Sequence, residues 1–142
     1  MLKRVFIVAV LTCLAPGVSG AAVPCLTYEP ATVELRGTVV RETFPGPPNY
    51  ESVKEGDAPE VVWLLQLAEP ICVSAKESDA EYPAASDLKR VQLVLTADEY
   101  KKFADLVGQP VVASGSLFAA HTGHHHADVL LTVEGMGPDP QK

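Results

Sequence analysis

Hydrophobic and polar residues alternate along most of this chain, with the two-residue period that is typical of half-buried β-strands. The alternation is regular over 32–39, where we expect the first strand, and Gly37 within it indicates a bulge or a sharp bend. A more continuous apolar run over 61–67 predicts a central strand that ends at Pro70, with 71–73 still extended. Three further strands are expected over 91–95, 111–118 and 128–133.

One segment has the helical period instead. Thr96 and Glu99 have the spacing of a capping box, which predicts that a helix begins there. Gly108, followed by Pro110, predicts where the helix ends. The buried face of this helix would consist of apolar residues at three- and four-residue intervals, namely Tyr100, Phe103, Ala104 and Val107.

The expected order is three strands, a helix and two strands, which is the order of the OB-fold, a small five-stranded Greek-key barrel. We therefore predict an all-β domain with one helix, an OB-like barrel over residues 22–134, followed by a disordered tail over 135–142. The polar, acidic stretch 74–89 is expected to be a loop. The alternative architecture is an open α+β sheet with one packed helix.

The N-terminus has the pattern of a secretory signal. Lys3 and Arg4 precede an apolar run over 5–14, which has the length of a signal h-region and is too short to span a bilayer. Small residues follow, and cleavage is expected after Gly20, Ala21 or Ala22. The pattern predicts a signal peptide over 1–21 and an exported protein, periplasmic or secreted, without a membrane span after cleavage.

Charge and cysteines agree with export. The chain has a formal net charge of −7, and loss of the two basic and no acidic residues of the signal makes it −9. This acidity disfavours nucleic acid, which needs a concentrated positive surface. Cys13 leaves with the signal, and we expect Cys25 and Cys72 to form a disulfide in an oxidising compartment. The pairing assumes a hairpin in which Val33 faces a residue near Leu67; the alternative is two separate thiols.

All four histidines lie within residues 121–126. If the fifth strand begins there, His124 and His126 lie on one side, with Asp128 continuing that side and His125 pointing the other way. His121 could fold back across Gly123 as a third nitrogen ligand, so these residues could hold Zn²⁺, Cu²⁺ or Ni²⁺. The alternatives are solvent-facing or hydrogen-bonded histidines without metal, and a pH sensor opened by protonation.

The loop after the first strand is rich in proline and aromatic residues. In OB-folds the loops after strands one and four lie on the ligand-binding side, so this loop and the histidines should be neighbours. The alternative is a loop made rigid to lower its entropy, beside an exposed polar turn. The expected ligand-binding residues are Phe44, Asn49, Tyr50, His121 and His124.

Four stretches, 25–30, 44–52, 115–120 and 121–126, carry a family resemblance. They resemble the bacterial exported proteins grouped as "domain of unknown function 4431". The resemblance covers roughly residues 25–133 and implies export and a domain of this extent. It implies no activity that could be transferred to this chain.

The residue pattern gives little support for an enzyme. There is no Ser-His-Asp order, nucleophile elbow or glycine-rich phosphate loop. The sequence therefore favours an exported binding module whose partner is an unknown small ligand, a metal or an exported protein. The alternative function is a metal-binding or metal-buffering protein that uses His121, His124 and His126, with Zn²⁺ or Cu²⁺ as the candidate ions.

Overall fold

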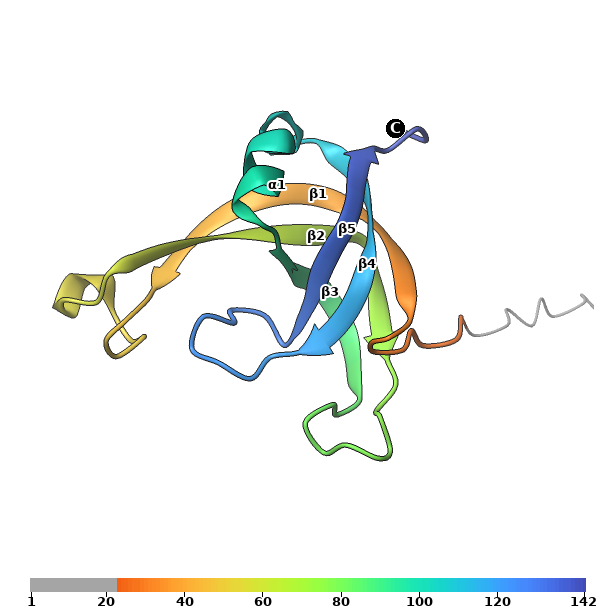
Figure 1. Ribbon diagram of the computed structural model, residues 1–142, viewed down its shortest axis with the longest axis horizontal. Coiled ribbons are helices and arrows are strands. Elements are labelled where there is room, and N and C mark those ends of the chain that lie inside the picture. Colours follow the sequence, from red (N-terminus) through yellow and green to blue (C-terminus); the bar gives the residue numbers. More distant parts are fainter. Residues whose placement is uncertain (1–22) are drawn as a thin grey trace, which may run out of the picture.

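The computed structural model describes residues 23–142, which form a closed five-stranded barrel in the order β1-β2-β3-β5-β4 (Figure 1). This confirms the predicted all-β class with one α-helix, and the order of strands and helix along the chain is the expected one. Because the barrel is closed, the alternative of an open sheet is wrong. All pairs are antiparallel except β3 with β5. The elements are β1 (Thr32–Pro45), η1 (Val53–Glu55), β2 (Pro59–Val73), β3 (Ala85–Val94), α1 (Ala97–Lys102), η2 (Ala104–Leu106), β4 (Pro110–Ala119) and β5 (Val129–Pro138).

The barrel closes because β1 is shared between two partners. Its first half, 32–38, pairs with β4, and its second half, 37–45, pairs with β2. Gly37 lies where the two halves meet, and a Cβ there would be 2.2 Å from the carbonyl oxygen of Gln66. The register runs through Gly37 without a shift on either side, so there is no bulge of the kind predicted. The glycine is instead required by a close backbone approach that a side chain would block.

Apolar side chains from all five strands fill the barrel. The largest fully buried ones include Leu65, Leu93, Leu117 and Leu131. The histidine-bearing connection and the loop after β1 leave this core at the same side. They are therefore positioned by strands whose register is fixed by the buried face.

Two strands are longer than the apolar pattern predicts. β2 continues through Pro70 to Val73, because the register shifts between Gln66 and Ile71 and proline is tolerated at such a bulge. β5 continues to Pro138, which pairs with Val111. The predictions that Pro70 ends the second strand and that 135–138 belong to a disordered tail are therefore wrong.

The expected loop 74–89 is also too long, because β3 begins at Ala85. Its first residues, ASDLKR, alternate weakly, and their pairing with β2 across the bulge forms the strand. The pattern of one chain segment does not reveal such a partner, since strand propensity depends on neighbouring strands.

The predicted capping box is present: the Thr96 hydroxyl accepts from the Glu99 amide, and the Glu99 carboxylate accepts from the Thr96 amide. The helix is shorter than expected, because α1 ends at Lys102 and a 3₁₀ turn follows. Phe103 is buried as predicted, whereas Ala104 is exposed. Gly108 has a φ of +81°, in the left-handed region that favours glycine.

Cys25 and Cys72 form the predicted disulfide. The supporting hairpin register is different from the expected one, because Gly37 faces Leu67 and Val33 pairs with Gly115 on β4. Residues 25 and 72 instead meet because the N-terminal segment runs beside the end of β2, where the Leu26 amide donates to the Cys72 carbonyl at 2.8 Å.

Beyond the barrel, the ends of β1 and β2 continue as a projecting hairpin, which we call the hairpin arm, residues 41–62 (Figure 1). Its connection, 46–58, is the arm loop. The connection between β4 and β5, 120–128, is the histidine loop and lies beneath the arm (Figure 1). Among residues 23–142, no helix is long and apolar enough to cross a membrane. The predicted signal peptide and Cys13 lie outside the described residues.

Candidate functional site

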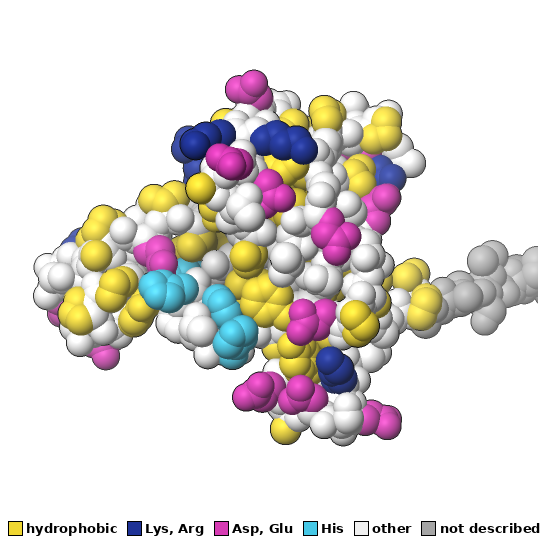
Figure 2. All heavy atoms as spheres, viewed as in Figure 1, with side chains coloured by type: hydrophobic (Ala, Val, Ile, Leu, Met, Phe, Trp, Pro, Cys, Tyr) yellow, Lys and Arg dark blue, Asp and Glu magenta, His cyan; other side chains and the backbone are white. Residues whose placement is uncertain are grey.

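The arm loop and the histidine loop are in direct contact, although 74 residues separate Tyr50 from His124. The Tyr50 hydroxyl lies 3.1 Å from Nε2 of His124, and the two rings pack edge to face with centroids 5.3 Å apart. Figure 2 shows histidine side chains exposed on this face, between the arm and the barrel. The structure therefore brings together Tyr50 and His124, two of the residues predicted to bind a ligand.

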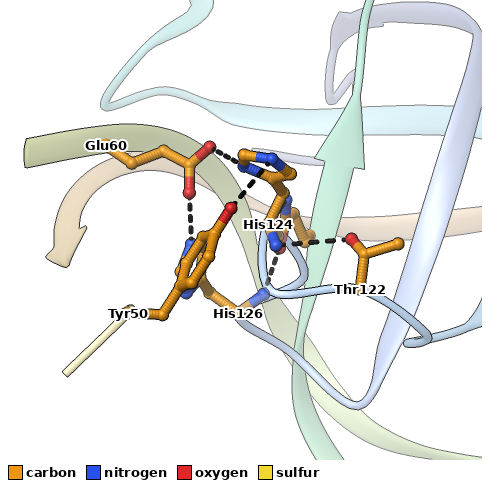
Figure 3. Close-up of polar contacts among 6 residues, drawn as sticks. Tyr50, Glu60, Thr122, His124 and His126 are labelled. Atoms are coloured by element: carbon orange, nitrogen blue, oxygen red, sulfur yellow. Dashed lines mark hydrogen bonds and ion pairs between the residues drawn. The ribbon is translucent and has the colours of Figure 1, made fainter. Parts of the chain in front are cut away.

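Glu60, at the start of β2, joins two of the histidines. One carboxylate oxygen accepts from Nδ1 of His124 at 2.5 Å and the other from Nε2 of His126 at 2.8 Å. Figure 3 shows the side chains of Tyr50, Glu60, His124 and His126 pointing toward one another. Glu60 was missed in the sequence analysis. Its only signal is an acidic residue directly after the arm loop, in the register position opposite Phe44.

Two opposing effects, burial and the contacts with histidines, act on the pKa of Glu60. Burial acts to raise the pKa of this carboxyl, but hydrogen bonds from His126 and His124, together with their charges, lower it more. The pKa of Glu60 therefore lies below the ordinary value for glutamate, and the group is an anion at neutral pH.

Phe44 supports the second of these histidines. Its ring stacks on the His126 imidazole with centroids 4.4 Å apart and an interplanar angle of 9°. Because Phe44 and Glu60 are direct cross-strand partners, they present their side chains to the same face of the arm. Phe44 thus lies in the predicted site, but one of its faces is already covered by His126.

The side chain of Gln92 on β3 hydrogen-bonds to the backbone of the histidine loop. Its amide nitrogen donates to the His124 carbonyl at 3.0 Å, and its amide oxygen accepts from the His126 backbone at 2.6 Å. The side chain is buried, so both polar ends need these partners. Sequence reasoning missed Gln92 as well. The signal was a polar residue inside the apolar run 91–95.

The arm loop is ordered by one carboxylate. Asp57 is buried and accepts from the backbone amides of Asn49, Glu51 and Ser52 at 2.8–2.9 Å. These three bonds hold the pKa of Asp57 below its ordinary value. The loop in turn holds Tyr50 in the left-handed region, with a φ of 60°.

Tyr50 also rests on the histidine loop through Gly123. A Cβ on Gly123 would lie 2.9–3.0 Å from three atoms of the Tyr50 ring, closer than real Cβ contacts allow. Gly123 therefore gives Tyr50 the space to reach His124. Asn49, by contrast, is exposed, and its backbone amide is used by Asp57.

His121 and His125 form a second, separate pair. Nδ1 of His125 accepts from the His121 backbone at 2.9 Å, and the rings lie 4.6 Å apart beside Phe118. Burial lowers the pKa of His125, and the charges of the other three histidines lower it further. His125 thus packs with His121 and not with His124 and His126. Because β5 begins only at Val129, the expectation that the fifth strand starts at the histidines is wrong, and strand alternation does not account for this arrangement.

The predicted metal set does not assemble as expected. His124 and His126 lie together, but His121 packs against His125, and Asp128 is an exposed residue whose backbone carbonyl binds the Ala120 amide. Within residues 23–142, no three His, Cys, Asp or Glu side chains are placed so that they could hold a metal ion as they stand.

An apolar cavity of about 340 Å³ lies elsewhere, between the N-terminal half of β1 and the C-terminal half of β2. Leu35, Leu67 and Ile71 contribute to its lining, and none of its residues belongs to the arm loop or the histidine loop. The polar groups that converge on one another are found at the two loops, so this apolar cavity and those groups do not coincide.

Comparison with known families gives a match to part of the chain. A family with the description "Domain of unknown function (DUF4431)" matches residues 90–136. This segment includes Gln92 and the whole histidine loop, and it excludes the arm loop. No curated protein matches the chain.

Proposed function

We propose, from the site itself, that this protein is an exported binding module. The DUF4431 family, which matches residues 90–136, has a description that names no activity. The ligand is held where the arm loop and the histidine loop meet. The observation that carries the proposal is the contact of Tyr50 with His124, because it joins two loops of unusual composition into one surface.

The barrel topology supports this location. In OB-folds the loops after strands one and four flank the ligand-binding face. Here these are the arm loop and the histidine loop. Loops carried on a rigid scaffold are also where binding residues concentrate.

The exposed groups at the junction indicate the kind of ligand. The His124 side chain is 56% exposed, whereas that of His126 is 10% exposed. Together with the exposed Thr122 and Asn49, the surface offers hydrogen-bonding groups beside an aromatic ring. A small polar ligand, or a polar side chain of an exported partner, suits this surface. The net charge of −7 disfavours polyanions such as nucleic acid.

Export to the periplasm or the medium is part of the proposal. The signal pattern over 1–21 supports it, and so does the Cys25–Cys72 disulfide, because such bonds persist in oxidising compartments.

The test is a titration of the metal-free, chelator-treated protein with small polar compounds (amino acids, sugars and organic acids), followed by amide NMR signals. Binding should shift signals of both loops together. Tyr50→Phe should weaken the binding, whereas Tyr82→Phe, which removes a hydroxyl bonded to Glu29 instead, should leave it unchanged. Shifts confined to the apolar cavity, or none with any compound class, would contradict the proposal.

A further inference from the structure

We propose that Glu60, His124 and His126 together bind one divalent transition-metal ion, Zn²⁺ or Cu²⁺. The inference rests on the proposed function, because it names a ligand class for the same junction of loops. It replaces the ligand set expected from the sequence, since Glu60 takes the place of His121 and Asp128.

The donor atoms are those that such ions prefer. Two imidazole nitrogens and a carboxylate form the three-protein-ligand set of many zinc sites, and imidazole also suits copper. Nδ1 of His124 and Nε2 of His126 both point at the Glu60 carboxylate, at 2.5 and 2.8 Å. A metal ion would occupy the place where each histidine now offers a proton to Glu60.

The site has to open slightly to accept the ion. Ligand atoms about 2.0–2.2 Å from a tetrahedral ion lie roughly 3.3–3.6 Å from one another. Each nitrogen must therefore move away from the carboxylate oxygen that it now contacts at 2.5 or 2.8 Å, and the two imidazoles must turn toward a common point. The His124 side chain is more than half exposed and can make this rotation. As they stand in the described part of the chain, the three side chains do not surround a common point, so binding requires this rearrangement.

Supporting contacts are already in place. When Nδ1 of His124 binds the ion, Nε2 carries the proton and donates to the Tyr50 hydroxyl, which lies at 3.1 Å. Gln92 fixes the backbone of both histidines, and Phe44 covers one face of His126. Partners of this kind orient the ligands of metal sites and often change metal affinity 10- to 100-fold.

The local charge favours a cation as well. The Glu60 carboxylate faces both imidazoles and brings a negative charge to the place that the ion would occupy. Ligands bind metal ions in their deprotonated forms, so the ion would displace the protons that now lie between the histidines and Glu60.

The experiment is calorimetric titration of the tag-free protein with ZnCl₂ and CuCl₂ in a non-chelating buffer at pH 7.5. We expect one ion per chain, with a dissociation constant below about 1 μM. Glu60→Gln keeps the size of the side chain and should weaken binding at least tenfold. His121→Ala combined with Asp128→Asn is the matched control and should bind as the unaltered protein does.

Three results would each overturn the proposal: no stoichiometric binding, binding that Glu60→Gln leaves unchanged, or binding that is lost in the His121 and Asp128 variant. If Glu60→Gln fails to fold, EPR of the unaltered protein loaded with Cu²⁺ provides the test. Hyperfine coupling to two nitrogen nuclei is expected, one from each histidine. Coupling to any other number of nitrogen nuclei would contradict the ligand set. The screen of small polar compounds uses chelator-treated protein. Failure of the metal site and failure of the binding module are therefore separate results.

Discussion

Gln92 uses both ends of its side-chain amide on the histidine loop, donating to the His124 carbonyl and accepting from the His126 amide. This single buried residue therefore sets the spacing of the two histidines that share Glu60. The hydroxyl of Tyr50 and the carboxylate of Glu60 then fix the orientation of the His124 ring. At this scale the site is a chain of hydrogen bonds in which each member restricts the next.

Replacement of Gln92 by leucine should test this role. The substitution keeps the approximate size but leaves a backbone donor and an acceptor without their partner, at a cost of about 1–3 kcal/mol in the free energy of unfolding. Urea unfolding measures the change. Gln66→Leu, on an exposed position of β2, is the matched control and should change little. Equal losses in both variants would show that Gln92 has no special role.

Gly123→Ala adds a single methyl group where the Tyr50 ring rests on the histidine loop, and so tests the contact between the two loops. The added methyl meets the Tyr50 ring, so the ring should move away from His124. We expect the aromatic ring-current shifts of the histidine loop in the NMR spectrum to decrease, with a small loss of stability. Gly137→Ala, where a Cβ has open space, should leave the spectrum of the loops unchanged. An unaltered Tyr50 environment in Gly123→Ala would contradict the geometry.

At the scale of elements, the arm loop depends on Asp57, which binds three backbone amides. Since the pKa of Asp57 is lowered in the folded protein, its contribution is complete above the ordinary aspartate pKa of 3.8 and is lost as the pH falls through the lowered value. Hydrogen exchange of the Asn49, Glu51 and Ser52 amides should therefore accelerate in acid relative to the barrel. Asp57→Asn should accelerate it at neutral pH, unlike Asp105→Asn at an exposed turn. If these amides exchange as slowly in Asp57→Asn as in the unaltered protein, the prediction is contradicted.

The elements also show what the sequence can predict. Alternation predicts the strands, and the capping box predicts where α1 begins, because both signals are local. The extension of β2 through Pro70 and the start of β3 at Ala85 depend on a bulge between two strands, which no single segment reveals. The same limit applies to the site. Tyr50 and His124 follow from the loop order of the OB-fold, whereas Glu60 and Gln92 become site residues only through register across strands.

At the scale of the whole molecule, the disulfide ties the N-terminal segment to the end of β2. The bond closes a span of 47 residues, and its removal is expected to cost about 4 kcal/mol by the loop-entropy argument. Cys25→Ser with Cys72→Ser should therefore lower the denaturation midpoint strongly. The contacts between the two loops do not involve Cys25 or Cys72, so they should persist in the folded fraction. Loss of those contacts at full folding would show that the disulfide also positions the site.

The arrangement of the molecule joins two distant loops at one side of a closed barrel, and every functional proposal depends on that junction. The most direct measurement is the nuclear Overhauser effect between the Tyr50 ring protons and the protons of Gly123 and His124 in the native protein. Strong cross-peaks to both residues are predicted, because the ring lies against Gly123 and within hydrogen-bond reach of His124. A fully assigned spectrum without these cross-peaks would contradict the joined site.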